Sequence, residues 1–440
     1  MVRAQDANAE QTDPLRPVTP SGGNGDEGVP LLGRRDFRLF LSAQLLGSGG
    51  VWMLRMAADW LVLEITGSPA AVGVLVALQF LPLLAVGPLG GVIADRHDKR
   101  HLVLFAQTAS AIVAITLATL TLTHTVVLWH LYVLAVVLGL IAAVEMPARQ
   151  VLVSEVVGDE SLRSAISMSN ALSQGGGMVG PALAGLVIAK VGQGWAFGVN
   201  ALVCLAVVAL LAAIRPTKHG PTLARGPGQL RDGFRFVGAR RQLLWVIVLA
   251  GSMGAFGLNG PVVFSAFADR VWRTGAGGFG LYNSVSAVGA LAGVLVAARL
   301  PRLRVRTIVI GAALFEIAEA IAAVMPTHAS FIVMLGVVGA TTMFFLTSAA
   351  TFVQLAAEPS VRGRVLAIYS PVLLGGHACG GLLQGWLAEE LGVRVGLAVT
   401  GGLALLATIV VALALAVRSW AAARRPSPDI GEVTPLTVAR

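Results

Sequence analysis

Hydrophobic residues occur along this chain in long runs that are interrupted by short polar segments. Most runs are about 20 to 25 residues long, and a helix of that length crosses about 30 Å of hydrocarbon. The runs lack the alternation of polar and apolar residues that a membrane β-barrel requires. The pattern therefore predicts an all-α membrane protein with twelve transmembrane helices, at residues 39–63, 70–94, 101–122, 127–146, 161–189, 195–214, 243–266, 277–298, 305–325, 329–352, 364–388 and 395–417.

The longest polar segment between two runs divides the predicted helices into two blocks of six. Inside this segment, residues 230–241 place apolar side chains on one helical face and arginines on the other, which predicts an amphipathic helix in the lipid headgroup region. We expect the following division of the chain: a disordered cytoplasmic tail (1–36), an N-terminal half (37–214), a cytoplasmic linker with the amphipathic helix (215–242), a C-terminal half (243–418) and a cytoplasmic tail (419–440).

The two halves resemble each other in sequence. Four glycines recur after 200 residues, so that Gly176, Gly180, Gly185 and Gly192 correspond to Gly376, Gly380, Gly385 and Gly392. The first three glycines of each set lie in the predicted fifth helix of their half, and the fourth follows that helix. This repetition predicts two pseudo-symmetric six-helix halves, an arrangement that places a substrate site between the halves near the middle of the membrane.

Composition supports this class, because 56% of the residues are hydrophobic and the mean hydropathy is +0.79. The net charge of +9 is compatible with nucleic-acid binding, but the charges are distributed as in a membrane protein. Nearly all basic residues of the short loops fall on one side of the predicted helices. The other side receives only Lys190, Arg270, Arg273 and Arg394. By the positive-inside rule both termini are cytoplasmic, and no nucleic-acid partner is expected.

Enzyme chemistry has no support in the chain. The sequence has no phosphate-binding loop, nucleophile elbow or metal-ligand cluster, and the short loops leave no room for a soluble catalytic domain. Cys204 and Cys379 lie in apolar helices and are expected to be packing residues. We therefore expect a monomeric non-enzyme in a bacterial inner membrane, with no cofactor and no metal.

The first predicted helix carries the strongest candidate site. Its polar stripe follows helical spacing and consists of Gln44, Ser48, Trp52, Arg55 and Asp59. Burying a charge in the membrane centre costs about 2.5–3.5 kcal/mol on insertion scales, so such groups pair, bind substrate or carry protons. Arg55 and Asp59 are four residues apart, and either a proton-carrying pair or a permanent structural ion pair would explain them.

A short charged turn, Gly91–Arg100, joins the second and third predicted helices. It resembles the loop signature of the major facilitator superfamily at Gly91, Asp95, Arg96 and Arg100, although Asp98 stands where that family usually has glycine. The resemblance implies that Asp95 faces the start of helix 11 near Arg364. It also implies a gate in which the arginines pair with carboxylates of neighbouring loops, namely Glu145, Glu155 or Asp159. Charges that serve membrane topology alone remain the alternative.

The fifth predicted helix contains Gly176, Gly180, Pro181 and Gly185. This spacing lets helices pack closely. It also resembles the helix-5 signature of facilitator-superfamily exporters and antiporters, with Ala184 in place of one glycine, and this resemblance implies efflux. Generic close packing is the alternative reading.

Residues 60–69, 146–150 and 165–185 resemble the transmembrane secretion effectors, a branch of the superfamily that includes enterobactin and macrolide exporters. The resemblance covers residues 35–418. One element is missing, since the run 130–144 lacks the helix-4 arginine of many drug–proton antiporters.

Other polar and aromatic residues at membrane depth are weaker candidates. Glu316 and Glu319 lie on a helix that is peripheral in this architecture. Several amides and a histidine fall on helices that border the cavity in such proteins: Gln79, Asn170, Gln174, Asn259, Asn283 and His377. Four aromatic residues could form cavity walls or packing: Phe256, Tyr282, Phe345 and Tyr369.

The sequence thus predicts a secondary transporter that exports an amphiphilic small molecule (a drug, antibiotic or siderophore-like compound) in exchange for protons. Two alternatives stay open. One is the uptake of a metabolite by the same machinery, and the other is a non-transporting membrane sensor on the same scaffold.

Overall fold

The computed structural model describes residues 31–157, 162–214, 235–300, 303–357 and 361–423, and most of these residues are helical. The long helices of the first part are α1 (Arg35–Thr66), α2 (Pro69–Arg96), α3 (Lys99–Leu122), α4 (Leu128–Val157), α5 (Leu162–Val191) and α6 (Gln193–Ala212), preceded by the 3-10 turn η1 (Leu31–Gly33). The second part contains α8 (Arg241–Phe256), α9 (Gly260–Ala266), the π-helical turn η2 (Phe267–Val271), α10 (Gly275–Ala298), α11 (Val305–Ala323), α12 (His328–Ala356), α13 (Arg362–Glu390) and α14 (Val393–Ala423).

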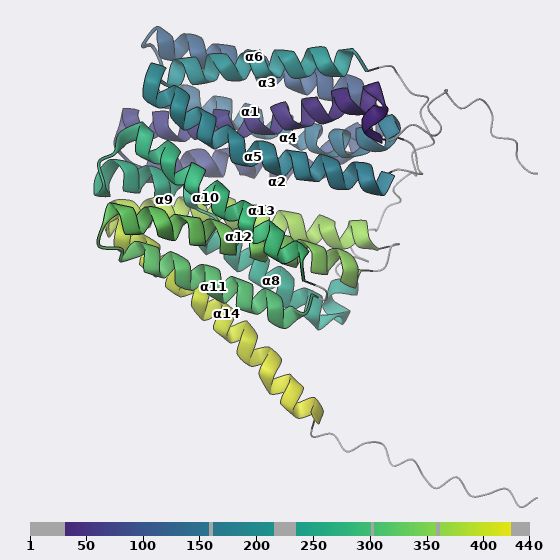
Figure 1. The fold of residues 1–440 in the computed structure, drawn as a ribbon, viewed down its shortest axis with the longest axis vertical. Coiled ribbons are helices and arrows are strands. Elements are labelled where there is room, and N and C mark those ends of the chain that lie inside the picture. The colour runs from purple at the N-terminus through teal and green to yellow at the C-terminus, as the bar shows by residue number, and fades with distance from the viewer. Residues whose placement is uncertain (1–30, 158–161, 215–234, 301–302, 358–360, 424–440) are drawn as a thin grey trace, which may run out of the picture.

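These helices form two bundles that lie side by side, α1 to α6 in one and α8 to α14 in the other (Figure 1). The beginning of α1 and the end of α14 lie at the same end of the molecule, on the right of Figure 1, which we call the tail end; the opposite end is the far end. Residues 230–234 of the predicted amphipathic linker helix lie outside the described residues, and residues 235–239 of it are helical.

The surface of the bundles suits a lipid environment. Ten helices of the described residues are long and apolar enough to cross a membrane. The two other long helices are α1, with 32 residues, and α11, with 19 residues. Each contains acidic residues: α1 carries Asp59 of the predicted stripe, and α11 carries Glu316 and Glu319. Large apolar side chains point outward from several helices, and Phe105, Val288 and Val333 are at least 70% exposed. Exposed apolar surface of this extent is explained by contact with lipid.

The seventh predicted helix is broken where the sequence pattern indicated a continuous one. Residues 257–259 are not helical and separate α8 from α9. Pro261 explains the break, because its ring has no N–H to donate and would clash with the carbonyl of Gly257 in a continuous helix. Pro261 instead lies in the first turn of α9, where its missing donor costs nothing. The break places Asn259, which is 1% exposed, at the start of the short helix.

The glycines of α5 lie at close contacts with two different helices. A Cβ atom added at Gly176 or Gly180 would meet the backbone of Gly49 in α1. Further along α5, Gly185 lies against the backbone of Gly280 in α10, which belongs to the other bundle. The same stripe of small residues on α5 therefore packs against a helix of its own bundle and, further along, against a helix of the other bundle.

The repeated glycines of α13 make the corresponding contacts. Gly376 and Gly380 lie against the backbone of α8, around Gly251 and Ala255, and Gly385 lies against α2 at Ala70 and Gly73. In both bundles, then, the fifth helix packs on the first helix of its own half and on the second helix of the other half. The contacts at Gly185 and Gly385 lie within about 10 Å of the far end, at 1.5 Å per residue.

This packing predicts that Gly180→Val destabilises the protein by about 1–3 kcal/mol, because the added methyl groups would force α5 away from α1. The matched control is Gly198→Val in α6, where an added Cβ meets nothing within 4 Å. Thermal unfolding of the purified variants in detergent measures the difference. Equal melting temperatures for the two variants would show that the α1–α5 contact is looser than described.

Candidate functional site

A cavity lies between the two bundles and is lined by both of them. We call it the central cavity. Its lining comes from α1, α2, α5, α9, α10 and α13, and consists of Trp52, Arg55, Met56, Asp59, Val76, Gln79, Phe80, Pro181, Pro261, Phe279, Asn283 and His377. Three residues of the predicted stripe on the first helix, Trp52, Arg55 and Asp59, are therefore brought to the interface between the halves.

The guanidinium group of Arg55 lies over aromatic rings. Its Cζ atom is 4.5 Å from the ring centroid of Phe80 and 5.5 Å from that of Trp52. Among the described residues no ion pair within 4.0 Å joins Arg55 to Asp59, so the direct contact of a permanent structural ion pair, one of the two alternatives from the sequence, is absent here. The reason is the side-chain direction, since a cation over a ring face is stabilised by the ring quadrupole and Arg55 points to Phe80.

Asp59 is almost completely buried, with 2% of its surface exposed, and its Oδ1 atom has no hydrogen-bond partner. Gln79 of α2 lines the same cavity as this carboxyl group. A buried carboxylate with an unsatisfied oxygen is costly in a membrane unless a proton, a cation or a ligand completes it. This atom is therefore a candidate for reversible binding.

Aromatic side chains connect the halves across the cavity. Phe80 lies between Arg55 and His377, and the rings of Phe80 and His377 pack edge to face with centroids 4.7 Å apart. Trp60 of α1 stacks on Phe279 of α10 at 5.7 Å. The Nδ1 atom of His377 has no hydrogen-bond partner. The cavity thus combines aromatic faces with unsatisfied polar atoms from both bundles.

The tail-end part of the helix-1 stripe has other partners. Gln44 accepts a hydrogen bond of 3.0 Å from Arg149 of α4, and the hydroxyl of Ser48 donates one of 2.5 Å to the carbonyl of Ser173 in α5. Neither residue lines the central cavity. The structure therefore divides the predicted stripe, because Gln44 and Ser48 join helices of the N-terminal bundle and only the remaining three residues face the other half.

The other polar residues that the sequence offered as candidates also divide into those that line the central cavity and those that do not. Gln79, Asn283 and His377 line the central cavity, whereas Asn259 does not. Asn259 donates to the carbonyl of Ala255 at 3.3 Å, and its Oδ1 atom is unpartnered. The side chains of Asn170 and Gln174 lie outside the described residues.

None of the four aromatic candidates, Phe256, Tyr282, Phe345 and Tyr369, lines the central cavity. Tyr282 is fully buried and its hydroxyl contacts His328 at 2.8 Å, while Phe345 is fully buried in the core. The aromatic walls are instead Trp52, Phe80 and Phe279. Sequence reasoning missed the last two, because phenylalanines in an apolar helix carry no signal of the direction in which they point.

The charged turn between α2 and α3 has two anchoring contacts. Asp98 accepts a hydrogen bond of 2.8 Å from the backbone N–H of His101 and so caps α3, which explains aspartate at this position. Arg100 donates to the carbonyls of Leu211 and Ala212 at 3.0 and 2.5 Å, at the end of α6. Arginine at a helix C-terminus stabilises the unpaired carbonyls there.

The predicted pairing of Arg96 or Arg100 with Glu145 is not formed in this structure. Arg100 is held at the end of α6, and Arg96 is exposed. Glu145 has an ion pair with Arg149, one turn along α4, and accepts a hydrogen bond of 2.7 Å from Gln107 of α3. The side chain of Asp95 and residue Asp159 lie outside the described residues.

The glycine that brings α2 close to its neighbour is Gly90, where an added Cβ would meet the carbonyl of Ala143 in α4. The adjacent Gly91 is the glycine of the loop signature that the sequence predicted. In the other bundle the equivalent contact of Gly293 is with Ala340 of α12.

Glu316 and Glu319 are buried between α11 and its neighbours, with 1% and 6% of their surface exposed. Thr408 of α14 donates a hydrogen bond of 2.8 Å to Glu316. Neither carboxyl group lines the central cavity. The two residues therefore lie apart from the site formed by α1 and α2.

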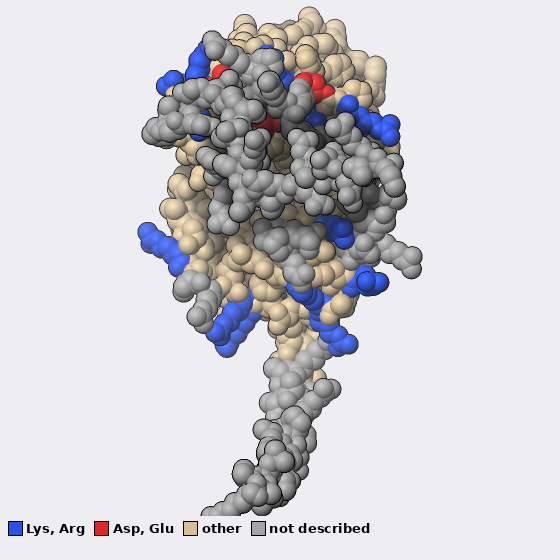
Figure 2. Space-filling model, turned by 90° about the vertical axis from the view of Figure 1, so that its right-hand side faces the viewer, with Lys and Arg blue, Asp and Glu red and all other residues tan. Residues whose placement is uncertain are grey.

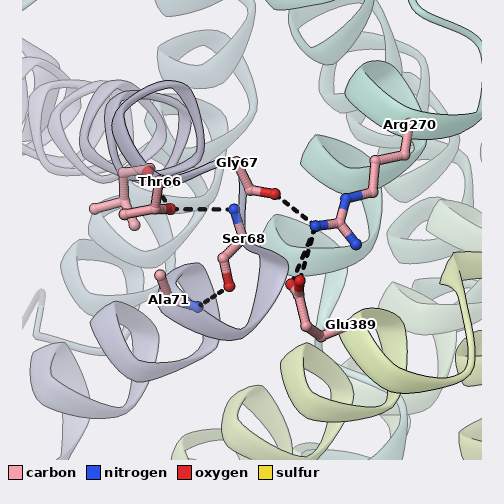
Figure 3. A network of polar contacts seen from close by, with 7 residues as sticks. Thr66, Gly67, Ser68, Ala71, Arg270 and Glu389 are labelled. Carbon is pink, nitrogen blue, oxygen red and sulfur yellow. Dashed lines mark hydrogen bonds and ion pairs between the residues drawn. The ribbon is translucent and has the colours of Figure 1, made fainter.

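A polar network holds the two halves together at the far end (Figure 3). Arg270 of η2 donates to the carbonyl of Gly67 at 2.5 Å and to both carboxylate oxygens of Glu389 in α13 at 3.1 Å. Gly67 ends α1 in the left-handed conformation with φ of 62°, and this conformation closes the turn into α2. We call Gly67, Arg270 and Glu389 the far-end clasp. Sequence reasoning placed Arg270 on this side but did not detect its partners.

The profile of a family described as "Transmembrane secretion effector" matches residues 29–435. The chain is similar to the enterobactin exporter EntS of Escherichia coli, with 25% identity over 80% of this chain and 85% of that protein. It is also similar to YfiS of Bacillus subtilis, an uncharacterised transporter of the major facilitator superfamily, with 27% identity over 37% of this chain and 38% of that protein.

Among solved structures, the crystal structure of the nucleoside transporter NupG superposes with a TM-score of 0.68 at 12% sequence identity, covering 86% of this chain and 98% of that chain. This likeness supports the major facilitator fold, as the sequence had predicted.

The far-end clasp predicts that Arg270→Gln favours a form in which the halves separate at the far end, since one donor group serves all three hydrogen bonds. Spin labels at the exposed positions 124 and 326, one in each half, report that distance after both native cysteines are replaced by serine. The label distance should lengthen in Arg270→Gln and stay unchanged in the control Arg273→Gln. Identical distances in both variants would mean that the clasp does not hold the halves together.

Proposed function

The chain belongs to the transmembrane secretion effector family of the major facilitator superfamily, and we propose that it exports an amphiphilic small molecule by alternating access in exchange for protons. Membership in this family of membrane transporters, rather than enzymes, is the premise. The observation that carries the proposal is the central cavity, in which the buried carboxyl group of Asp59 keeps an unsatisfied oxygen beside Arg55 and three aromatic rings.

The distribution of charge supports an orientation with the tail end in the cytoplasm of a bacterial inner membrane. Basic side chains gather around the tail-end face (Figure 2). The far end of the described chain carries few basic residues, among them Lys190, Arg273 and Arg394. By the positive-inside rule the basic side is cytoplasmic. The far-end clasp then faces the outside, and the protein acts as a monomer with both termini inside.

The lining of the central cavity favours an amphiphilic substrate. Trp52, Phe80 and Phe279 offer ring faces to an apolar or aromatic body, while Arg55, Asn283 and His377 offer polar atoms for orientation. Sites of this composition, mostly apolar with a few placed polar groups, are typical of small-molecule binding. EntS, which is named as an enterobactin exporter, supports export rather than uptake at the level of the family branch.

Proton exchange follows from the state of Asp59. A neutral carboxylic acid is stable in the closed, apolar cavity, whereas the ionised form needs water or a cation nearby. Asp59 therefore takes up a proton when the cavity opens to the outside. It releases the proton when the cavity opens to the cytoplasm and a substrate enters. Arg55, held over Phe80 within the same cavity, favours the ionised form during release.

Alternating access requires that the same cavity is closed at one end while it is open at the other, and that the two ends exchange these roles. The clasp and the contacts Gly185–Gly280 and Gly73–Gly385 close the far end in this structure. These contacts are short-range and specific, so a rotation of one bundle against the other would break all of them together. The charged turn at Gly91–Arg100 lies at the tail end and is suited to the opposite closure.

We expect Asp59→Asn to abolish proton-driven efflux, because the amide cannot exchange a proton. Asp36→Asn, in the first turn of the same helix, is the control with the same loss of charge. Efflux of each compound in a panel of lipophilic antibiotics and siderophores is measured in cells with matched amounts of membrane-inserted protein. Undiminished efflux by Asp59→Asn would reduce this residue to a structural role.

Dissipating the proton gradient with an uncoupler should stop efflux and raise the substrate content of cells that express the protein. Cells without the protein should show no such difference. Efflux that continues at the same rate after uncoupling would contradict antiport. Accumulation that falls on uncoupling would instead support uptake of a metabolite.

A further inference from the structure

A second cavity lies within the N-terminal bundle, and we propose that protons leave Asp59 through it, with Glu145 as the carrier at its tail-end side. This inference rests on the proposed proton exchange and goes beyond it by separating the proton route from the substrate route. The cavity, which we call the N-half cavity, is lined only by helices α1, α2, α3, α4 and α6. No residue of the C-terminal bundle is among its lining residues, so it need not open when the halves move.

The N-half cavity shares one wall with the central cavity. Arg55 and Gln79 line both of them, and in the central cavity both residues lie in the lining together with Asp59. A proton that leaves Asp59 on the side of Gln79 therefore reaches the N-half cavity without crossing the space between the halves. Asp59 itself lines only the central cavity.

The polar groups in the N-half cavity can hold water. Gln79, Gln107, Ser110, Glu145 and Asn200 line it among apolar residues. Gln107 is 2% exposed, and its Oε1 atom has no hydrogen-bond partner among the described residues. Buried water occupies spaces in which at least two polar groups face it, and this cavity offers them along its length. Water is therefore the medium that we assign to the route.

Glu145 lies at the tail-end side of this cavity. Gln44, which shares Arg149 with Glu145, is about 16 Å from Arg55 along α1, at 1.5 Å per residue. The carboxylate is held by Arg149 on its own helix and by Gln107 of α3. The other titratable or charged groups of the lining are Arg55 of α1 and the thiol of Cys204 on α6. Among the described residues that line this cavity, Glu145 carries the one carboxylate.

The partners of Arg149 allow Glu145 to gain a proton. Arg149 also donates to Gln44 at 3.0 Å, so it keeps a hydrogen bond when the charge of Glu145 is neutralised. The side chains of Glu145 and Arg149 are 13% and 15% exposed, so the ion pair is not completely enclosed. A pair with a second acceptor and some exposure can open at moderate cost.

The proposed proton transfer from Asp59 to Glu145 conserves the number of protons at each step. The carboxylic acid of Asp59 gives its proton to water in the N-half cavity and becomes a carboxylate. Water gives one proton to the carboxylate of Glu145, which becomes a carboxylic acid and releases the ion pair with Arg149. Glu145 then gives its proton to water at the tail end, and the ion pair forms again. One proton has moved, and no other bond has changed.

The alternative is that Glu145 and Arg149 form a permanent ion pair that only ties α1, α3 and α4 together. The two roles differ in a property that can be observed directly. A carrier gains and loses a proton over the working pH range, whereas a permanent pair stays ionised.

Infrared difference spectra of the full-length protein in lipid nanodiscs, between about pH 5 and about pH 8, test this without any substrate. We expect Glu145→Gln to remove one carboxylic-acid carbonyl band, and Glu145→Asp to shift that band, which assigns it even if the glutamine variant folds poorly. The exposed carboxylate of Glu64 gives the control, Glu64→Gln, which should leave the band in place. A spectrum unchanged by both Glu145 variants would overturn the proposal.

The same spectra separate this inference from the proposed function. Asp59→Asn should remove a second carboxylic-acid band, distinct from that of Glu145. A wild-type spectrum without an Asp59 band would contradict proton exchange at Asp59 itself. The route is tested by Ala142→Phe, which fills the N-half cavity, against Val133→Phe, on the exposed face of the same helix. After a pH jump, the Asp59 band should respond several-fold more slowly in Ala142→Phe alone. Equal rates in the two variants would overturn the separate route.

Discussion

Burying a charged or polar group in the membrane interior costs free energy, and that cost organises this structure. Several polar groups inside the bundles form hydrogen bonds with neighbouring helices. Gln44, Gln107 and Arg149 surround Glu145, and Ser48 bonds to the backbone of α5. Several buried polar atoms of the described residues have no partner, and those of Asp59 and His377 are the ones that lie in the cavity between the halves. We interpret these two residues as the places where a proton and a substrate bind.

The close contacts of small residues make the rest of the architecture possible. Without a hydrophobic driving force between helices in lipid, bundles are held by backbone approach and interhelical hydrogen bonds. Glycines of α5 and α13 serve both purposes, since one part of each helix packs within its bundle and another part meets the opposite bundle. A seam of this kind is closely fitted but contains few polar bonds. It can therefore separate at modest cost, as a transporter requires.

The fold was largely predictable from the sequence, because twelve apolar runs and a repeat of glycines after 200 residues leave few alternatives. The broken seventh helix was not predicted, although Pro261 after Asn259 and Gly260 carried the signal. The site was predictable in part. The spacing of Trp52, Arg55 and Asp59 identified one face of α1, but it could not show that Arg55 would point to Phe80 instead of Asp59. Contacts between residues far apart in the chain, such as Arg270 with Gly67 and Glu389, depend on how helices meet and leave no local pattern.

The central claim is that one cavity is reached alternately from the two ends, and a reversible cross-link at the far end tests it most directly. Ala189→Cys and Gly277→Cys, introduced with Cys204→Ser and Cys379→Ser, would join α5 to α10 near the far end, where an added Cβ at residue 277 lies 3.7 Å from the Cβ of Ala189. We predict that oxidation stops proton-driven efflux and that reduction restores it in the same membranes. Efflux that continues at its full rate with the cross-link completely formed would contradict the account.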